Sequence, residues 1–264
     1  MTSLTNLPSE AVARRMVEHV ILGGKRQCPA CYTNLKVSKG YLWCRICRKK
    51  LRPKAGTWLR HCRLTYRQLL TLLWCWQKRQ APGTACLVAG ASYTTVRRWY
   101  WRFRALVPPV LPELSGIVEV DEAYFGRRRY GRQTIVVGAI ERDTRRLRLQ
   151  VIPDTEQDSL EWFITRCVAR SSLLLTDAHA GYSDLEFYGY THERCNHSVG
   201  HFGPTNQIEN TWSIMKRYLR KLYGCIPTNR LQLILNEWMA RHNSLRLFAS
   251  PQAYLQEVCS VRVD

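Results

Sequence analysis

Three acidic residues, Asp121, Asp177 and Glu209, stand in local contexts that suit one metal-binding catalytic site. Asp121 lies inside an apolar, β-favouring run over residues 116–125, and Asp177 directly follows a second such run over residues 173–176. Glu209 lies in the first turn of a predicted helix. Two strand-end carboxylates and one helical carboxylate can hold two divalent ions, which clamp the attacking and leaving oxygens of a phosphoryl transfer. We therefore expect all three residues to bind Mg²⁺ or Mn²⁺.

The two strand carboxylates have alternative interpretations. A carboxylate among Ile and Val residues is costly to bury without a partner, but Asp121 is also compatible with a solvent-facing edge position. Asp177 is also suited to cap the segment that follows it. Side chains alternate along a strand, so Asp121 should share a face with Glu119, and Glu122 should point the other way.

The helix that carries Glu209 is predicted over residues 206–223 and is amphipathic. Its apolar stripe consists of Ile208, Trp212, Met215, Leu219 and Leu222. A polar stripe runs beside it through Glu209, Ser213, Lys216 and Arg220. Asn206 and Glu209 also fit a capping box at the start of the helix. The polar stripe predicts Glu209 at the metal ions and Lys216 and Arg220 at DNA phosphates.

Four cysteines near the N-terminus form two C-x-x-C pairs, Cys28/Cys31 and Cys44/Cys47, with 12 residues between the pairs. Two such knuckles make a tetrahedral Zn²⁺ site, and four thiolates leave no open position for catalysis. A structural zinc ribbon is therefore predicted, and a redox role is disfavoured because no thioredoxin-like context accompanies the pairs. The basic residues expected to bring the ribbon to DNA are Arg45, Arg48, Lys49 and Lys50. The remaining cysteines, predicted to be buried thiols, are Cys62, Cys75, Cys86, Cys167, Cys195, Cys225 and Cys259.

Residues 85–99 resemble a helix-turn-helix. Gly90 falls in the turn, where a left-handed backbone costs glycine little, and Ser92 can cap the second helix. Val96 and Trp99 should face the first helix. The cations expected on the remaining surface are Arg97, Arg98, Arg102 and Arg104. Such a second helix would enter a DNA major groove; the alternative is an ordinary helical hairpin.

The charge of this 264-residue chain is +20 and uneven. Residues 1–116 contain 21 Lys or Arg against 3 Asp or Glu, whereas the remainder contains 19 against 17. This asymmetry predicts a basic nucleic-acid-binding half joined to a balanced catalytic half. A solubility surface or a membrane-binding patch is the alternative, but no lipid-anchoring helix accompanies the charge.

Targeting signals are not recognisable in the sequence. No apolar run reaches the roughly 18 residues of a membrane span, and the start, Met1-Thr-Ser-Leu-Thr-Asn, does not resemble a signal peptide. We therefore expect a cytoplasmic, nucleoid-associated protein.

The predicted elements divide the chain into an N-terminal helix (1–24), the zinc ribbon (25–56), a helix-turn-helix region (57–107), a proline-rich linker (108–116) and a catalytic domain (117–264). The catalytic part begins with strands over 117–125, 133–141 and 145–152. A helix over 158–170, a strand over 172–176, another helix and a short strand over 179–195, and helices over 206–223 and 228–245 follow. This order predicts an α/β, RNase H-like core in which helices flank a mixed sheet.

Three sequence blocks resemble the signatures of bacterial insertion-sequence transposases of the 1595/1016 type. They are Val120–Gly126, Thr176–Tyr182 and Asn206–Arg217, and the resemblance extends from Cys28 to the C-terminal helices. These are DDE-type transposases with an N-terminal zinc ribbon. The resemblance implies that Asp121, Asp177 and Glu209 are the DDE triad and that Lys216, seven residues after Glu209, is the family's basic residue on that helix. Asn210 is the alternative third position.

The activity implied by this resemblance is binding of terminal inverted repeats, hydrolysis at transposon ends and attack of the freed 3′-hydroxyl on target DNA. The cofactors would be two Mg²⁺ or Mn²⁺ ions and one structural Zn²⁺, and the partners double-stranded DNA and at least one further copy of the chain. Alternatives are an RNase H-like nuclease or resolvase without strand transfer, and a domesticated DNA-binding regulator. In the loop before residue 206, His197 and His201 could contact DNA, assist the site, bind a second zinc with Cys195, or be structural.

Overall fold

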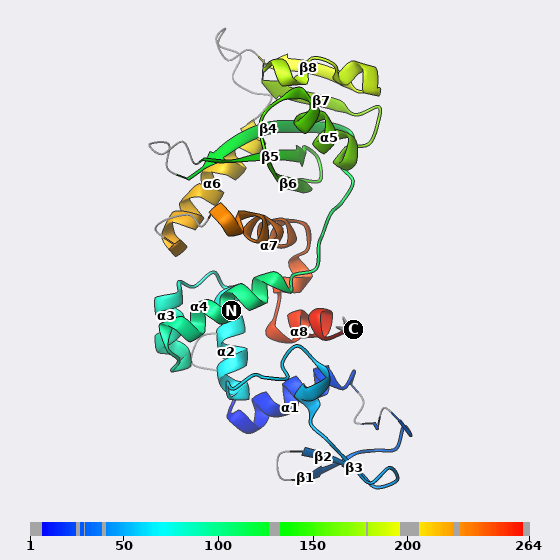
Figure 1. The fold of residues 1–264 in the computed structure, drawn as a ribbon, viewed down its shortest axis with the longest axis vertical. Coiled ribbons are helices and arrows are strands. Elements are labelled where there is room, and N and C mark those ends of the chain that lie inside the picture. The colour runs from blue at the N-terminus through cyan, green and yellow to red at the C-terminus, as the bar shows by residue number, and fades with distance from the viewer. Residues whose placement is uncertain are drawn as a thin grey trace. The chain divides into compact units, whose positions relative to one another are not determined.

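The chain forms two compact units, and each is described by itself. A computed structural model describes residues 7–24, 27–28, 30–38, 41–126, 133–177, 179–195, 206–223 and 228–260. The N-terminal unit comprises Met1–Pro108 together with Arg246–Asp264, and the central unit comprises Pro109–Leu245 (Figure 1). Across these described ranges, no helix is both long and apolar enough to cross a membrane.

A five-stranded mixed sheet forms the centre of the central unit. Its strands are β4 (Ile117–Phe125), β5 (Thr134–Glu141), β6 (Leu147–Ile152), β7 (Leu173–Asp177) and β8 (Thr191–Cys195). The spatial order is β6-β5-β4-β7-β8. β4, β5 and β6 pair antiparallel, whereas β7 pairs parallel with both β4 and β8. An antiparallel meander extended by parallel strands next to its first strand is the RNase H-like arrangement, so the predicted fold class is confirmed.

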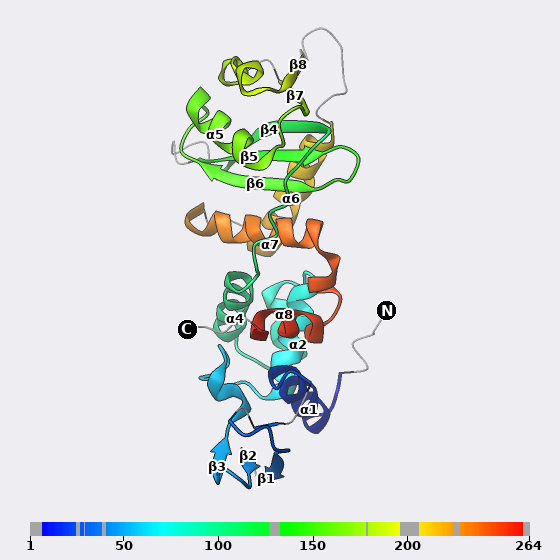
Figure 2. The same ribbon diagram turned by 90° about the vertical axis from the view of Figure 1, so that its right-hand side faces the viewer.

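Helices cover both faces of this sheet. They are α5 (Gln157–Cys167), α6 (Asn206–Tyr223) and α7 (Leu231–Asn243), with short 3-10 turns η4 (Ala180–Tyr182), η5 (Leu185–Tyr188) and η7 (Thr228–Arg230). Val118 and Val120 of β4 join the apolar core beneath α5. α6 contacts β4 and β5, and α7 contacts β6. Figure 2 shows α7 and α5 on opposite sides of the sheet. The alternating faces of β4 therefore meet different helices.

The N-terminal unit combines a small sheet with a helical cluster. The sheet is antiparallel and contains β1 (Lys36–Ser38), β2 (Tyr41–Cys44) and β3 (Lys49–Leu51). The helices are α1 (Glu10–Ile21), α2 (Tyr66–Gln77), α3 (Pro82–Ala89), α4 (Tyr93–Ala105) and α8 (Pro251–Ser260), with 3-10 turns η2 (Pro53–Gly56) and η8 (Leu245–Phe248). Glu10 of α1 accepts hydrogen bonds from the first amides of α2, at Tyr66 and Arg67. This contact joins two helices far apart in sequence.

Aromatic packing explains why the C-terminal helix belongs to the N-terminal unit. We expected residues 117–264 to form one domain, but the central unit ends at Leu245. The ring of Tyr254 lies 5.3 Å from that of Trp76 and 6.0 Å from that of Phe103. Its hydroxyl also donates to the Phe103 carbonyl at 2.7 Å. Such pairs add to the free energy gained by burying the rings. They join residues far apart in sequence, so the proline-rich linker from which we predicted the domain boundary gives no indication of them.

Candidate active site

Three carboxylates meet where strands β4 and β7 separate. The parallel register between these strands ends at Glu119 opposite Leu175. Asp121 and Asp177 each lie two residues further along, at the carboxyl end of the paired region, where open sheets carry their sites. One carboxylate oxygen each from Asp121, Glu122 and Asp177 lies within 4.8 Å of the others. The structure therefore brings together the two predicted strand carboxylates and adds a third.

Glu122 is the member that the sequence reasoning missed. Alternation along β4 indicates the opposite face, and its carboxylate indeed accepts a hydrogen bond from the Tyr182 hydroxyl, which lies in the core on the α5 side. The carboxylate nevertheless remains beside Asp177, which is the last residue of the neighbouring strand β7. The adjacent Asp121–Glu122 pair at the end of strand pairing is the signal that could have indicated it.

The electrostatics of this cluster favour a bound cation. The pKa of Asp121 is raised to about 6, mainly by burial and in part by the charges of Asp177 and Glu209, against the lowering effect of a hydrogen bond from Trp212. Burial likewise raises the pKa of Glu122 to about 7, with contributions from Asp121 and Asp177. Carboxylate oxygens are the preferred ligands of Mg²⁺ and Mn²⁺. A divalent cation would relieve the repulsion that these three groups otherwise exert on one another.

A pH dependence follows for the metal-free protein. The pKa values of about 6 for Asp121 and about 7 for Glu122 exceed unfolded values of about 3.9 and 4.3. The folded state therefore holds protons that the unfolded state has already released, and the free energy of unfolding should fall as pH rises from about 4 to about 7. Thermal unfolding in EDTA across this range measures the effect. A Glu122→Gln variant should show a shallower fall; an equally steep fall would contradict this origin.

Asp121 is oriented by the indole of Trp212 on α6. The Trp212 Nε1 donates to Asp121 Oδ2 at 3.0 Å, and its ring packs edge-on against Phe125 at 6.2 Å. Gly138 lies opposite Asp121 in the β4–β5 register. A Cβ atom at position 138 would lie 2.6 Å from two Trp212 ring carbons. The absence of a side chain at Gly138 therefore admits the indole that holds Asp121.

Substituting Gly138 tests this arrangement. Gly138→Ala should lower the free energy of unfolding by about 1–3 kcal/mol, the usual cost of overpacking, because the indole must move. Trp212→Phe, which loses the Nε1 donor together with part of the buried ring, should weaken Mn²⁺ binding about 10–100-fold, as loss of an outer-shell partner does. Chemical denaturation and calorimetric Mn²⁺ titration measure the two effects. Gly83→Ala is the control, because a Cβ there meets nothing within 4 Å; an equal loss of stability in both glycine variants would refute the packing argument.

Glu119, on the same face of β4 as Asp121, holds the start of α6. Its fully buried carboxylate accepts the amides of Gln207 at 2.8 Å and Ile208 at 3.1 Å. The Arg142 guanidinium donates to it from Nε and Nη2 at 3.1 and 3.0 Å. Accepting the first amides of a helix is the role of a cap. The alternative of Asn206 as an N-cap outside the helix is wrong, because α6 includes Asn206. Glu119 of β4 caps the helix instead, from a distant part of the chain.

The polar stripe of α6 extends from the carboxylate cluster. Glu209 is exposed in the first turn, and its charge contributes to the raised pKa of Asp121. Lys216 is half-buried, with its Nζ 5.5 Å from the centre of the Phe125 ring. Burial lowers the pKa of Lys216, while Asp121 raises it and Arg220 lowers it. Arg220 and the alternative residue Asn210 are exposed. The predicted apolar stripe packs inward, with Ile208, Trp212, Met215 and Leu219 buried.

The four cysteines of the predicted ribbon converge in the N-terminal unit. Their sulfur atoms all lie within 4.8 Å of one another. The Cys31 and Cys44 sulfurs are 3.4 Å apart, those of Cys28 and Cys47 are 3.9 Å apart, and the Cys47 amide donates to the Cys44 sulfur at 3.3 Å. This convergence of four thiols fits a structural Zn²⁺. The neighbouring cations Arg45, Arg48, Lys49 and Lys50 are all exposed.

The other cysteines are less uniformly buried than predicted. Cys75 and Cys167 are buried, whereas Cys62, Cys86 and Cys259 are partly exposed. Burial raises the pKa of the Cys75 thiol to about 11 and that of Cys167 to about 12. The side chain of Cys195 and residues Cys225, His197 and His201 lie outside the described residues.

Helices α3 and α4 have the turn that the sequence predicts. Gly90 between them is left-handed, with φ 59°, and the Ser92 hydroxyl accepts from the Thr95 amide at 3.3 Å. Val96 and Trp99 are buried, as predicted. Arg97 and Arg98 are exposed. Arg102 is partly buried, and Arg104, expected at the surface, is 2% exposed. Its guanidinium lies 4.8 Å from the centre of the Trp101 ring, and this cation–π contact helps to stabilise the buried charge.

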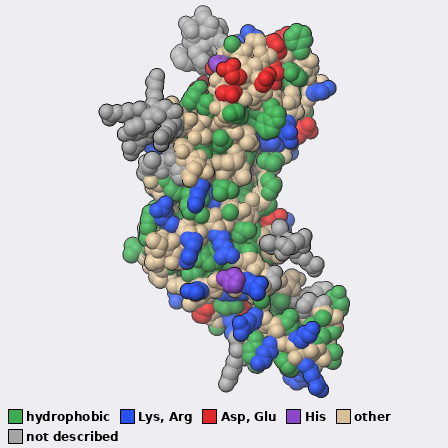
Figure 3. All heavy atoms as spheres, viewed as in Figure 1, with side chains coloured by type: hydrophobic (Ala, Val, Ile, Leu, Met, Phe, Trp, Pro, Cys, Tyr) green, Lys and Arg blue, Asp and Glu red, His purple; other side chains and the backbone are tan. Residues whose placement is uncertain are grey.

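The surface charges follow the division of the sequence. On the face drawn in Figure 3, Lys and Arg side chains gather over the helices and ribbon of the N-terminal unit, whereas Asp and Glu side chains gather near β7 and β8 of the central unit. A basic surface attracts phosphates, and an acidic one attracts cations.

Several known proteins are similar to this chain. Residues 113–243 match the family of ISXO2-like transposase domains. A transposase-like protein of Haemophilus influenzae is 34% identical over 98 residues, which cover 36% of this chain and 78% of that protein. Among solved structures, the catalytic core domain of BIV integrase is 18% identical, with a TM-score of 0.37, and the match covers 50% of this chain and 86% of that one. The HTLV-2 integrase catalytic core in complex with magnesium is 15% identical, with a TM-score of 0.37, over 57% and 99% of the two chains.

The family match spans both strand carboxylates and the whole of α6, so the similarity falls on the residues that build the site. By this match and by its identity to the Haemophilus protein, the chain belongs to the ISXO2-like transposase family.

Proposed function

We propose that this protein is a DNA transposase that binds terminal inverted repeats, cleaves phosphodiester bonds at transposon ends and joins the 3′-hydroxyl ends to target DNA. The observation that carries the proposal is the carboxylate cluster of Asp121, Glu122 and Asp177 where β4 and β7 part. Family membership makes a transposase-type DNA-cutting function the context for this cluster.

The proposed division of labour assigns metal binding to Asp121, Asp177 and Glu209, and Glu122 lies beside the two aspartates. Divalent ions bound there would stabilise the negative charge that develops on the phosphoryl group and on the attacking and leaving oxygens. Trp212 and Gly138 fix the position of Asp121. Lys216 and Arg220 would bind DNA phosphates beside the reacting bond, because they follow Glu209 along α6. Catalysis then depends mainly on positioning and charge stabilisation.

End recognition is assigned to the N-terminal unit. The ribbon cations Arg45, Arg48, Lys49 and Lys50 would contact DNA, and α4 would act as the second helix of a helix-turn-helix with Arg97, Arg98 and Arg102. A Zn²⁺ held by the four cysteines would have a structural role. The partners are double-stranded DNA and another copy of this chain, since two ends must be paired before joining; a DNA substrate also places the activity at the nucleoid.

A strand-transfer assay tests the proposal. The reaction combines the purified protein with Mg²⁺ or Mn²⁺, a labelled duplex that carries the flanking inverted repeat, and a supercoiled target plasmid. The Asp121→Ala variant is assayed in parallel. We expect metal-dependent joined products that the variant does not form. Cleavage without joining would instead establish a nuclease or resolvase. Tight binding without either reaction would establish a DNA-binding regulator.

A further inference from the structure

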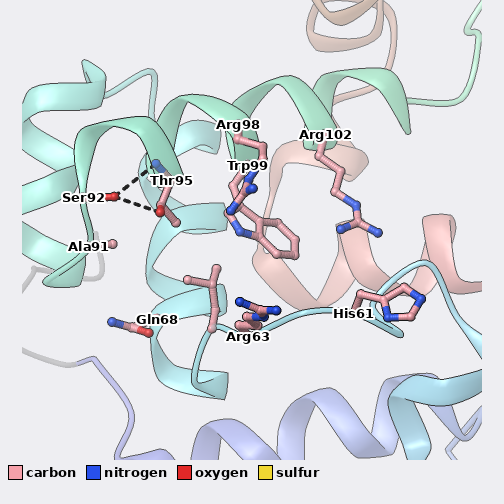
Figure 4. Close-up of a pocket in the computed structure, with 10 residues that line it drawn as sticks. His61, Arg63, Gln68, Ala91, Ser92, Thr95, Arg98, Trp99 and Arg102 are labelled. Carbon is pink, nitrogen blue, oxygen red and sulfur yellow. Dashed lines mark hydrogen bonds between the residues drawn. The ribbon is translucent and has the colours of Figure 1, made fainter.

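A groove with a volume of about 770 Å³ lies within the N-terminal unit, between α4 and the loop over residues 57–65 that leads into α2. Its lining residues are His61, Arg63, Leu64, Gln68, Ala91, Ser92, Thr95, Arg98, Trp99 and Arg102. Figure 4 shows Arg98 and Arg102 extending from α4 toward the loop that carries Arg63 and His61. The groove thus joins one face of α4 to a second chain segment that the helix-turn-helix pattern does not include.

The charge of the groove is of one sign. Three of its ten lining residues are arginines, one is a histidine, and among these described residues none is Asp or Glu. The hydroxyls of Ser92 and Thr95 lie at one end, 2.9 Å apart. Guanidinium groups and hydroxyls are the donors that most often contact phosphate and sugar oxygens. The lining therefore matches a polyanionic chain.

Arg102 is held in place before any ligand arrives. Its guanidinium donates to the Trp58 carbonyl and lies 5.3 Å from the Trp58 ring centre and 5.1 Å from that of Trp99. Because the Arg102 guanidinium already rests against two indoles, it loses little side-chain entropy when it binds a ligand. A guanidinium is positively charged throughout the physiological pH range. Arg102 consequently contributes a fixed positive charge to the wall of the groove.

Arg97 belongs to a different face of the same helix. It precedes Arg98 by one residue, which on an α-helix corresponds to a rotation of about 100°, and it does not line the groove. Its guanidinium lies 5.8 Å from the ring centre of Tyr93, which is 50% exposed. The exposed cations of α4 are thus divided between a groove face and an outer face.

We infer that this groove binds the sugar–phosphate backbone of DNA, with Arg63 and Arg98 as phosphate contacts from two chain segments, while Arg97 on the outer face reads base edges. The inference rests on the proposed DNA-binding function and deepens it, because it adds the loop over 57–65 to the interface and separates two roles on one helix. Backbone contacts set affinity irrespective of sequence, whereas base-edge contacts set specificity.

Salt-dependent binding of the full-length protein tests the inference. Anisotropy of a labelled inverted-repeat duplex, and of a scrambled duplex of equal length, is measured from about 50 to 200 mM KCl. Arg63→Ala and Arg98→Ala should each weaken binding to both duplexes about tenfold, the effect of one charged hydrogen bond. Each should also lower the slope of log affinity against log salt by about 0.9. Arg97→Ala should weaken binding to the inverted repeat more than to the scrambled duplex.

Arg60→Ala is the matched control, because Arg60 is an exposed arginine of the same loop that does not line the groove. The slope of log affinity against log salt should be the same in Arg60→Ala as in the wild-type protein. Unaltered slopes in both groove variants would overturn the inference, as would a loss of slope in Arg60→Ala equal to that in the groove variants. Competition by polyglutamate that is lost in the groove variants, with DNA slopes intact, would assign the groove to an acidic protein segment instead. Reduced slopes in a protein that joins no DNA would leave the groove assignment standing and remove the transposase proposal.

Discussion

Replacing Asp177 by asparagine is expected to abolish DNA cleavage and joining while leaving binding of the transposon end unchanged. Asp177 ends β7 and offers one oxygen to the cluster with Asp121 and Glu122. Its Oδ1 also accepts the His179 amide at 3.0 Å, a turn contact that an asparagine oxygen can keep. The substitution therefore removes charge without removing the local hydrogen bond. Loss of an outer-shell partner already costs about 10–100-fold, so loss of a direct ligand should exceed that.

The measurement compares joined product, cleaved product and duplex affinity in one preparation of the Asp177→Asn variant. Asp184→Asn is the control, because Asp184 is a partly buried carboxylate of the same unit that accepts from Gln157 at 2.8 Å and lies outside the cluster. Cleavage at the wild-type rate by Asp177→Asn would remove Asp177 from the site. A parallel loss of activity in both variants would indicate a general effect of charge on the fold.

The order of strands and helices and the location of the strand carboxylates could be predicted from the sequence because both depend on local patterns. Hydrophobic runs of the right length indicate β4 and β7, and the chain order of the elements restricts the sheet to few topologies. Asp121 and Asp177 follow from these runs, since Asp121 lies inside the first run and Asp177 directly follows the second. Gly90 and Ser92 were predictable for the same reason, as turn residues have specific backbone and capping preferences.

Other features of the site depend on contacts between residues far apart in sequence. Glu122 joins the cluster because β7 ends beside β4, although alternation places it on the opposite face. Glu119 caps α6, 88 residues away. Gly138 admits the Trp212 indole across β5. A single sequence shows the type of each residue but not its partner, so such roles become visible only with the tertiary fold.

The cations of α4 illustrate the same limit. Arg97, Arg98, Arg102 and Arg104 are similar in type and spacing, and all four were expected at the surface. In the structure, Arg104 is buried against Trp101, and Arg102 lies beside the indoles of Trp58 and Trp99. Helical periodicity gives the angle of a side chain around its helix, but the depth of its burial depends on the aromatic residues that surround it. Net charge therefore overstates the number of arginines that remain for DNA.

The second large effect is expected from the zinc ribbon. Cys44→Ser should remove the bound Zn²⁺, unfold residues 27–51 and weaken binding to the inverted repeat. Cys44 is fully buried and packs with Leu35 and Leu42 in a core with few other apolar side chains. So small a core supplies little stability by itself. Structural Zn²⁺ contributes about 10–16 kcal/mol in comparable small modules, and most of this is lost when one of four thiolates is replaced.

Three properties of Cys44→Ser should therefore change together. Mass spectrometry should show loss of zinc, limited proteolysis should cleave the ribbon, and the affinity for the duplex should fall. Chelation of zinc from the wild-type protein should reproduce all three changes. Cys86→Ser is the control, because Cys86 is a partly exposed cysteine outside the cluster whose sulfur donates to the Pro82 carbonyl, a hydrogen bond that serine can keep. Because the carboxylate cluster belongs to the central unit, Cys44→Ser should retain Mn²⁺ binding there. Normal end binding by a zinc-free variant would show that the ribbon is not required for recognition, and α4 and its groove would then account for DNA binding alone.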